Sequence, residues 1–411
     1  MASEVPKKVG IIGGGQLAWM MGQAASTLGI KLVIQTPQVD DPAIALSHPL
    51  STIDPVPVLA PINDGAATAQ LAHRCQLITF ENEFVNLTQL QQLEQSGVCF
   101  RPSLNALNPL LDKYKQRLFL DTIGLPVPRF CPLHPYHWSL IRKSRTSAEL
   151  REITTAHGDF PFSLTFPLVL KTRCHGYDGQ GTFIISDLST LQTLGLRFQN
   201  TPLLVEEFVP FVQELAIIAA RDLDGHIKIY PLVETQQINQ VCHRVIAPAV
   251  VDQSILQQCH RIAHTILHQL EYVGIMGIEL FLTSQGNVLI NEIAPRTHNS
   301  GHFTLNACKT SQFEQHLRAI SGLPLGSIDL TCDAAVMINL LGYEQNNDQY
   351  EVQRQAIAQL PGAFVWWYGK SQSRPGRKLG HVTVKLTTPN SLIRQTALET
   401  AMEVENLWRT H

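Results

Sequence analysis

The stretch from Gly277 to His302 constrains this chain more than any other, because it fixes two carboxylates on a predicted β-hairpin. Apolar runs flank a polar break at residues 283–287, a pattern that predicts strand, tight turn and strand. If the turn centres on Gln285-Gly286, Glu279 and Glu292 are equally far from it, and their Cβ atoms face each other roughly 5 Å apart. Like charges repel in that position. A divalent cation held between the carboxylate oxygens is one reason to keep both.

Two further polar clusters lie in predicted loops. The first follows the hairpin directly and contains Arg296, His298, Asn299 and His302. The second places four cations in nine residues, namely Lys370, Arg374, Arg377 and Lys378. Such a basic loop can clamp a phosphate. Standing alone it would be interpreted as a solvated turn.

The composition sets the limits within which these clusters act. A chain of 411 residues suggests two to four domains, and 44% hydrophobic with 16% charged residues is typical of a soluble globular protein. The net charge of −3 means that any anion binding is local. The eight cysteines form no CxxC pair and no zinc spacing, which favours buried thiols in a reducing cytoplasm. We expect neither a signal peptide nor a membrane span, since the N-terminal apolar run is short.

The N-terminal segment predicts a βαβ unit with a glycine turn. A strand at Val9–Ile12 precedes Gly13-Gly14-Gly15, and a helix to Leu28 precedes a strand at Lys31–Ile34. The spacing fits the dinucleotide fingerprint, but the second strand ends without the acid that would hold a ribose hydroxyl. Three interpretations stay open: a weak nicotinamide site, a turn that only lets the helix pack, or amides that hold a substrate phosphate.

Another buried strand, Leu77–Phe80, carries Glu81 and Glu83 just past its carboxyl end. In open α/β sheets ligands bind at that end of the strands. Either glutamate could instead be a solvated loop charge, and for Glu83 we expect this.

The central part of the chain alternates helices with strands. Asn108-Pro109 predicts the start of a helix that carries Lys113 and Arg117. Residues 134–166 have no clean period, and we expect one helix with irregular flanks. A strand ending at Lys171 then precedes a loop with three glycines in six residues, 176–181, whose amides can fold over a phosphate.

Six segments, in this order, resemble the ATP-grasp superfamily and within it the biotin-independent carboxylating ligases of purine biosynthesis. They are GGGQL (13–17), ITFENE (78–83), KTRCHGYDGQG (171–181), EEFVPF with QEL (206–215), GIELF to NEIAPRTHNSGH (277–302) and TSQFEQHLRA (310–319). The resemblance implies an α/β and α+β protein of three parts. These are a Rossmann-like domain (1–106), an ATP-grasp domain (107–326, with a glycine-loop subdomain at about 167–209) and a small β-rich domain (327–411).

The resemblance also implies a reaction. ATP phosphorylates bicarbonate to carboxyphosphate, and the amine of 5-aminoimidazole ribonucleotide captures the carboxyl group, giving ADP, phosphate and an N5-carbamate. The implied cofactor is Mg²⁺, as two ions that Mn²⁺ could replace, with ATP as co-substrate and no biotin. The implied protein is a cytoplasmic homodimer whose partners are small molecules, with neither nucleic acid nor membrane among them.

Site residues carry over from the resemblance in four groups. The catalytic group is Arg296, His298, Asn299 and Lys171. Binding of ATP is implied for Lys113, Lys171, Gly176, Tyr177, Asp178, Gly179, Gln180, Gly181, Thr182, Glu206, Glu207, Phe208, Val209, Glu214, Asn291 and Glu292. Binding of the nucleotide substrate is implied for Gln16, Leu17, Glu81, Tyr177, Asp178, Lys370, Arg377 and Lys378. Metal binding is implied for Glu279 and Glu292.

The sequence departs from the family pattern at three places. Gln180 stands where Lys or Arg is usual, Thr297 stands where Pro is usual, and residues 134–166 are longer than is typical. Three alternatives remain. A formate-dependent glycinamide ribonucleotide transformylase is disfavoured by Gln16 and by the HNSGH sequence, a non-catalytic nucleotide-binding protein is suggested only by Gln180, and a nicotinamide dehydrogenase lacks its acid.

Overall fold

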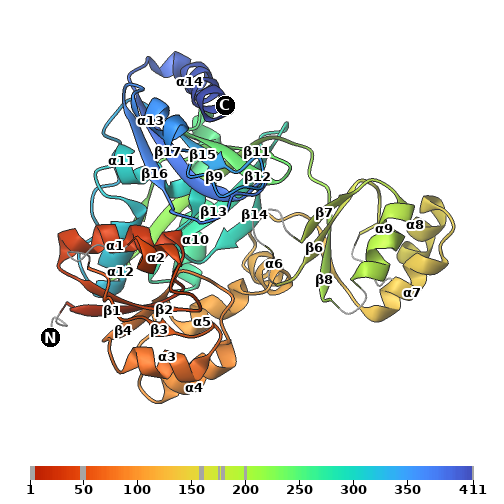
Figure 1. Ribbon diagram of the computed structural model, residues 1–411. Helices are drawn as coiled ribbons and strands as arrows, with labels where there is room; N and C mark the ends of the chain where they lie inside the picture. Colours follow the sequence, from red (N-terminus) through yellow and green to blue (C-terminus); the bar gives the residue numbers. More distant parts are fainter. Residues whose placement is uncertain are drawn as a thin grey trace. The chain divides into compact units, whose positions relative to one another are not determined.

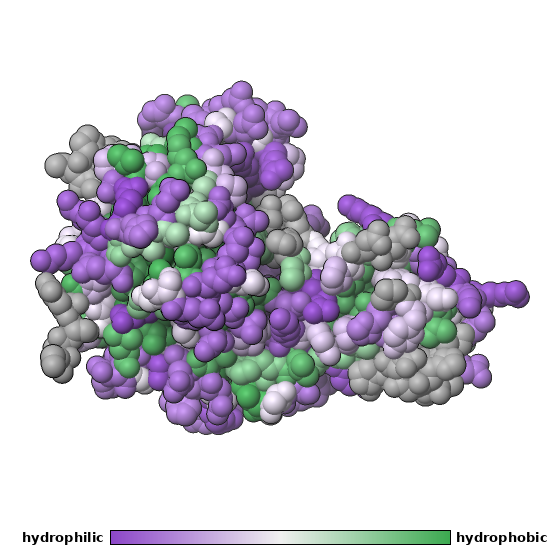
Figure 2. Space-filling model, turned by 90° about the horizontal axis from the view of Figure 1, so that it is seen from below, coloured by the Kyte–Doolittle hydropathy of each residue, from purple (hydrophilic) through white to green (hydrophobic). Residues whose placement is uncertain are grey.

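The computed structural model describes residues 5–46, 52–156, 162–174, 176, 181–198 and 201–409 (Figure 1). The chain forms two compact units. The first comprises Met1–Asn108, Glu214–Glu279 and Ala294–His411, and the second comprises Pro109–Gln213 and Leu280–Ile293. Hydrophilic side chains cover most of the face seen in Figure 2, with smaller hydrophobic areas between them. Among the described residues, no helix has the length and apolar character needed to cross a membrane.

The first unit begins with a parallel sheet in the order β3-β2-β1-β4. Its strands are β1 (Lys8–Ile12), β2 (Lys31–Thr36), β3 (Val58–Leu59) and β4 (Leu77–Phe80), and its helices are α1 (Gln16–Leu28), α2 (Pro42–Ala45), α3 (Gly65–Ala72), α4 (Leu87–Gln95) and α5 (Leu104–Leu107). The predicted βαβ opening is confirmed. Helix α1 ends as predicted at Gly29, whose φ of 65° is the left-handed conformation that glycine adopts at a helix end.

A long antiparallel sheet forms the middle of the first unit, in the order β13-β9-β11-β12-β15-β17-β16, with β10 paired to β9. Its strands are β9 (Phe211–Arg221), β10 (Ile227–Ile229), β11 (Val233–Ile238), β12 (Val241–Ala247), β13 (Gly274–Thr283), β15 (Ala334–Leu341), β16 (Ala363–Trp367) and β17 (Lys378–Leu386). The accompanying helices are α10 (Gln253–Gln269), η2 (Asn299–Gly301), α11 (Thr304–Ala307), α12 (Gln312–Ser321), α13 (Glu351–Ala358), η3 (Asn390–Leu392) and α14 (Ile393–Arg409).

Helix α12 joins two parts of the first unit. Its apolar residues Phe313, Leu317 and Ile320 pack into the core beneath α1. Its His316 accepts a hydrogen bond at Nδ1 from the backbone N–H of Ile275 (3.2 Å) and is bonded through Nε2 to the hydroxyl of Thr79 (2.8 Å). The strand that precedes Glu81 and the strand that carries Glu279 are therefore both bonded to one buried side chain, His316.

The second unit is built on an antiparallel sheet in the order β5-β8-β6-β7. Its elements are α6 (Lys113–Thr122), β5 (Phe130–Leu133), α7 (Pro135–Lys143), α8 (Ser147–Ala156), β6 (Leu168–Thr172), β7 (Thr182–Ile185), α9 (Leu188–Arg197) and β8 (Leu203–Glu207). The predicted strand before the glycine loop is confirmed as β6, and β7 follows the loop. Trp138, Leu150 and Leu191 close the core over this sheet.

Two predictions in the second unit are wrong. Residues Asn108–Leu110 form only the 3-10 turn η1, and α6 begins at Lys113 because the carboxylate of Asp112 accepts hydrogen bonds from the N–H groups of Tyr114 and Lys115. The described part of this range, residues 134–156 and 162–166, contains two helices and not one. The backbone of Ser144 is extended after α7, which separates it from α8.

The predicted hairpin is confirmed as strand, turn and strand. Residues Leu280–Thr283 continue β13 into the second unit, and β14 (Val288–Ala294) pairs with β13. The N–H of Thr283 donates to the carbonyl of Asn287 at 3.0 Å, and Gly286 has a φ of 77°. Glycine adopts this conformation without strain, which explains its place in the turn.

Candidate active site

A closed ring of buried polar groups lies in the second unit. The two carboxylate oxygens of Glu206 on β8 accept from Nε of Arg117 (2.5 Å) and bind Nζ of Lys171 (2.8 Å). Nη2 of Arg117 donates to the carbonyl of Asn291 (2.6 Å), and Nζ of Lys171 donates to Oδ1 of Asn291 (3.1 Å). The three charged side chains are only 3–6% exposed. Each of these charged side chains is therefore stabilised by bonds to other protein groups and not by hydration.

The charges in this ring persist because they compensate one another. Burial would raise the pKa of Glu206, but Arg117 and Lys171 outweigh burial and lower it to about 2. Burial lowers the pKa of Lys171, and the carboxylate of Glu206 opposes that shift. Two cations on one carboxylate leave net positive charge beside Lys171, which suits a phosphate.

Arg117 was not predicted to take part in the site. Helix geometry could have found it, since Arg117 lies four residues after Lys113 and therefore on the same face of α6. The preceding residue, Gln116, binds both the N–H and the carbonyl of Ile293 (2.8 and 3.1 Å). Adjacent side chains of α6 thus hold the backbone of β14 on either side of Glu292.

Glu292 is already neutralised in this structure. Its carboxylate forms an ion pair with Nζ of Lys113. Burial would raise the pKa of Glu292, but Lys113 and Lys171 hold it below its ordinary value. In the first unit, a carboxylate oxygen of Glu279 lies 3.5 Å from Nε2 of His298. Glu292 therefore has a cationic partner without a metal, and a metal shared between Glu279 and Glu292 stays a prediction.

The glycine loop is described only at its ends. Gly176, Gly181 and Thr182 lie within the described residues, whereas Tyr177, Asp178, Gly179 and Gln180 lie outside them. Gly181 has a φ of 85°, and a Cβ there would approach the hydroxyl of Thr172 to 2.2 Å. This position therefore requires glycine.

The segment at 206–209, for which the family resemblance implies ATP binding, begins with two glutamates in different roles. Glu206 belongs to the buried ring, and Glu207 pairs with Arg129 on the more exposed side of β8. Phe208 and Val209 follow, and backbone pairing with the base stays a prediction. In the first unit, burial and then the charge of Glu279 raise the pKa of Glu214 to about 7.

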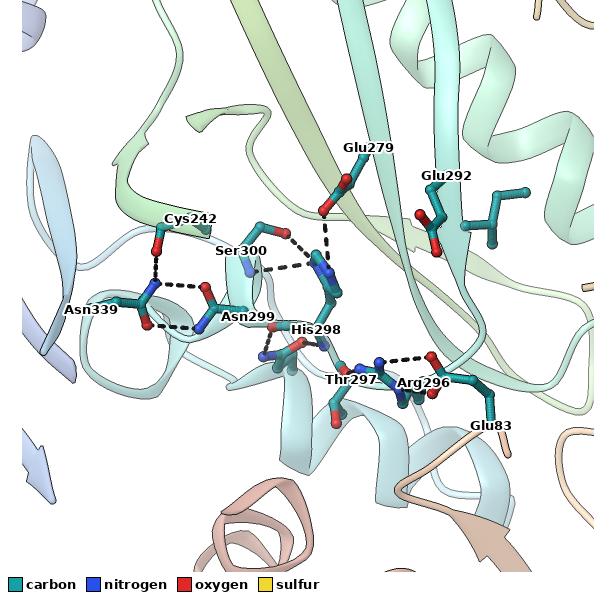
Figure 3. Close-up of polar contacts among 12 residues, drawn as sticks. Glu83, Cys242, Glu279, Glu292, Arg296, Thr297, His298, Asn299, Ser300 and Asn339 are labelled. Carbon is teal, nitrogen blue, oxygen red and sulfur yellow. Dashed lines mark hydrogen bonds and ion pairs between the residues drawn. The ribbon is translucent and has the colours of Figure 1, made fainter. Parts of the chain in front are cut away.

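The loop after β14 is held at three successive functional residues (Figure 3). Arg296 makes a bidentate ion pair with Glu83, through Nε and through Nη2 (3.0 Å). Glu83 is 19% exposed, so its assignment as a solvated loop charge is wrong. The ring of His298 lies between Glu279 and the hydroxyl of Ser300, with 2.9 Å from Nδ1 to Oγ.

A buried amide fixes the backbone of the same loop. Oε1 of Gln312 accepts from the N–H of His298 (2.9 Å), and Nε2 donates to the carbonyl of His298 (2.7 Å). Asn299 pairs with Asn339 on β15. Thr297 is fully buried, and its hydroxyl has no hydrogen-bond partner among the described residues, where a proline would bring no hydroxyl to satisfy.

Glu81 lies against the glycine turn. A Cβ added at Gly13 or Gly15 would come within 2.4 Å of its carboxylate oxygens, and the N–H of Leu17 donates to it. Burial is the largest cause that raises the pKa of Glu81 to about 7. One interpretation of the glycine turn was that its amides hold a substrate phosphate. The carboxyl group of Glu81 lies against the turn at that place. Gln16 and Leu17 lie beside it, in the first turn of α1.

The cations of the basic loop have different surroundings, and Lys370 lies near Tyr368. Nζ of Lys370 donates to the carbonyl of Lys378 (2.8 Å) and lies 5.5 Å from the ring centre of Tyr368. Nη1 of Arg377 donates to the carbonyl of Gln372 (2.9 Å). Lys378 is buried on β17, while Arg374 is exposed. The loop therefore presents an ordered set of cations.

Comparisons with known proteins agree with this architecture. A family model of the ribonucleotide synthetase preATP-grasp domain matches residues 6–109, one of the ATP-grasp domain matches 119–313, and one of the phosphoribosylaminoimidazole carboxylase C-terminal domain matches 335–395. The fold and the arrangement of charges thus define an ATP-grasp enzyme.

Comparisons with individual proteins show which kind of ATP-grasp enzyme this chain resembles. An N5-carboxyaminoimidazole ribonucleotide synthase of Synechococcus elongatus is 48% identical over 97% of this chain and 95% of its own. A carboxyaminoimidazole ribonucleotide synthase of Aspergillus clavatus complexed with ATP has a TM-score of 0.84 and 30% identity, covering 98% of both chains. A structure from the same organism with ADP and 5-aminoimidazole ribonucleotide has a TM-score of 0.83 and 29% identity, covering 98% of this chain and 99% of its own. The chain belongs to the N5-carboxyaminoimidazole ribonucleotide synthase family.

The buried ring should be a main source of stability in the second unit. Arg117→Met is expected to lower the free energy of unfolding by about 3–5 kcal/mol, because it leaves the buried carboxylate of Glu206 short of one cation. Glu206 has a depressed pKa, so its contribution is present above the ordinary value of 4.5 and is lost as the pH falls toward about 2. The variant should therefore also unfold at a higher pH in acid titration.

Urea unfolding at pH 7 measures the first effect, and Arg129→Met is the matched control. Arg129 pairs with Glu207, the next residue on the same strand, but is 64% exposed. Its loss should cost about 0–1 kcal/mol. Equal losses in the two variants would contradict the importance of the ring.

The raised pKa of Glu81 has a consequence for stability. Folding strengthens proton binding at Glu81, from an ordinary pKa of 4.5 to about 7, so ionisation of Glu81 destabilises the fold progressively across that range. Glu81→Gln removes this titration. The melting temperature of the variant relative to the wild type should therefore be higher at pH 8 than at pH 5. A difference that does not change with pH would show that Glu81 titrates normally.

Proposed function

We propose that this chain catalyses the ATP-dependent carboxylation of 5-aminoimidazole ribonucleotide with bicarbonate, in de novo purine biosynthesis. The product is N5-carboxyaminoimidazole ribonucleotide, and carboxyphosphate is the intermediate. The observation that carries the proposal is the loop at 296–299. Its arginine, histidine and asparagine gather on one short segment, and separate buried or half-buried partners hold each of them.

The charged groups of the second unit suit the transfer of a phosphoryl group. That reaction depends on positioning and charge neutralisation, because the enzyme forms no covalent bond. Lys171, held by Glu206 and Asn291, would bind the phosphates of ATP, and Lys113 would add a second cation. The glycine loop at 176–181 would cover the phosphates and exclude water.

The donor set at Glu279 and Glu292 fits Mg²⁺. Both residues offer carboxylate oxygens, the ligands that this hard cation prefers, and both side chains are partly exposed, at 28% and 37%. When bound, Mg²⁺ would neutralise charge on the ATP phosphates. Lys113 would then exchange Glu292 for a phosphate oxygen.

The groups of the first unit suit bicarbonate and the amine. Arg296 and Asn299 would orient bicarbonate, and His298 would stabilise the anion that develops. Lys370, Arg377 and Lys378 would bind the 5′-phosphate of the nucleotide. Glu81, with its pKa of about 7, would lie with Gln16 and Leu17 beside the ribonucleotide. We also propose that the protein acts as a homodimer in the cytoplasm, which sedimentation and cell fractionation can test.

A steady-state assay of ADP release tests the function. With Mg²⁺ and ATP present, release should require both bicarbonate and 5-aminoimidazole ribonucleotide. Release that instead requires formate and glycinamide ribonucleotide would overturn the assignment in favour of a transformylase. Binding of ATP without turnover under either substrate pair would indicate a non-catalytic protein.

Glu292→Gln should abolish Mg²⁺-dependent ATP turnover and leave the fold intact. The amide keeps the shape of the side chain but removes the charge that would hold the metal. Turnover and circular dichroism are the measurements. Glu152→Gln, an exposed glutamate on α8 of the same unit, is the control and should keep full turnover. A Glu292→Gln protein that unfolds, or one that stays active, would contradict the metal role.

Arg377→Ala should weaken binding of the ribonucleotide far more than binding of ATP. A charge-assisted bond to phosphate contributes about 1.5–3 kcal/mol, which corresponds to a rise of roughly 10- to 100-fold in the KM for the ribonucleotide. Arg374→Ala, an exposed arginine in the same loop, should have a smaller effect. Equal increases in both KM values for Arg377→Ala would show that the loop does not bind this substrate.

A further inference from the structure

Asn339 holds the side chain of Asn299 from the buried side of the loop (Figure 3). Nδ2 of Asn299 donates to Oδ1 of Asn339 at 2.9 Å, and Nδ2 of Asn339 donates to Oδ1 of Asn299 at 2.8 Å. Nδ2 of Asn339 also donates to the carbonyl of Cys242 on β12 at 2.9 Å. Asn339 is 4% exposed, so water does not compete for these bonds.

The carbonyl of Cys242 decides which way both amides point. Two paired amides can turn over together, exchanging donors and acceptors without losing a bond. The carbonyl of Cys242 can only accept, so Nδ2 of Asn339 must face it, and Oδ1 of Asn339 must face Nδ2 of Asn299. This polarity passes from the backbone of β12, through Asn339, to Asn299. The orientation of Asn299 is therefore set by a main-chain group of another strand.

The pairing with Asn339 also fixes the orientation of the N–H and the oxygen lone pair of Asn299 that it does not use. An asparagine amide has two N–H groups and two lone pairs on its oxygen. The bonds to Asn339 use one of each, and Asn299 is half-buried at the end of its loop. One N–H and one lone pair remain for a ligand, and both have a fixed orientation. An amide without this support would rotate and present either group.

The place of Asn339 in its strand argues against a purely structural asparagine. Strand β15 has the sequence AAVMINLL, in which Asn339 is the only polar residue, and the strand is buried along nearly its whole length. An apolar residue there would avoid the cost of burying an amide. The amide is explained if its partner, Asn299, must keep one orientation.

We propose that Asn339 is a positioning residue for the bicarbonate end of the site, which fixes the amide of Asn299 so that one N–H has a constant direction toward the anion. This inference rests on the proposed function, in which Asn299 orients bicarbonate. Asn339 itself touches no substrate.

A double-mutant cycle tests the inference with four proteins: wild type, Asn299→Ala, Asn339→Leu and the double variant. The measurement is the KM for bicarbonate in bicarbonate-depleted buffer, with ATP and 5-aminoimidazole ribonucleotide saturating. Asn339→Leu should raise this KM about tenfold, as expected when a reacting group loses its alignment. The KM for ATP should not change. In the Asn299→Ala background, Asn339→Leu should have no further effect on the KM for bicarbonate, because the group that it positions is gone.

Controls separate positioning from stability. Asn306→Asp changes a half-buried asparagine of the same unit, and its carboxylate can still accept from the indole N–H of Trp366. Its KM for bicarbonate should equal that of the wild type. If Asn339→Leu does not fold, Asn339→Ser replaces it in the cycle. Asn339→Asp presents an acceptor at both positions that face Asn299, so the two orientations of the Asn299 amide become equivalent and neither is fixed. The KM for bicarbonate should then rise as in Asn339→Leu.

The outcomes distinguish the inference from the function. A wild-type protein without bicarbonate-dependent ATP turnover would overturn both. An active wild type in which the effects of Asn339→Leu and Asn299→Ala multiply, or in which Asn339→Leu raises both KM values equally, would overturn only the role of Asn339. An unchanged KM for bicarbonate in Asn299→Ala would also overturn it.

Discussion

The buried carboxylate of Glu206 is the group on which the second unit depends. A carboxylate removed from water is costly unless charged partners surround it, and Arg117 and Lys171 supply that charge. Once the ring is formed, three elements are fixed together, namely α6, β6 and β8. The backbone of Asn291 joins β14 to them. Lys171, which would hold ATP, is therefore immobilised before any ligand arrives.

In the first unit, neutral and charged groups likewise hold predicted functional side chains in place. Glu83 holds Arg296, Gln312 holds the backbone of His298, and Asn339 holds Asn299. Substrate-facing groups that are held in place lose little conformational freedom when ligands bind. A small anion such as bicarbonate offers few contacts. A loop that recognises it gains most from being ordered in advance.

Short sequence patterns predicted the strands, turns and helix ends that depend on interactions between residues close in sequence. The strands near residues 9–12, 31–34 and 77–80, the hairpin turn and the end of α1 were all readable from apolar runs and glycine positions. The start of α6 was not, because the capping side chain of Asp112 overrode the Asn108-Pro109 signal. Residues 134–166 lacked periodicity, so their division into two helices stayed hidden.

The supporting residues could not be predicted, because their partners are distant in sequence. Arg117 and Glu206 are 89 residues apart, and Glu83 and Arg296 are 213 apart. The sequence shows which side chains are charged but not which opposite charge the fold brings to them. For that reason Glu83 was expected in water, and a metal was the partner suggested for the carboxylates of Glu279 and Glu292. Family resemblance predicted which groups face substrates, whereas the groups that hold them appeared only in the three-dimensional structure.

The central claim is that the charged groups around Glu292 form a nucleotide and metal site whose partners exchange when ligands bind. A crystal structure with Mg²⁺ and a non-hydrolysable ATP analogue tests it most directly. The account predicts Mg²⁺ about 2.1 Å from carboxylate oxygens of both Glu279 and Glu292. It also predicts that Nζ of Lys113 lies on a phosphate oxygen and that Lys171 is still held by Glu206. An analogue bound with the ion pair of Lys113 and Glu292 intact, and with the metal held elsewhere, would contradict it.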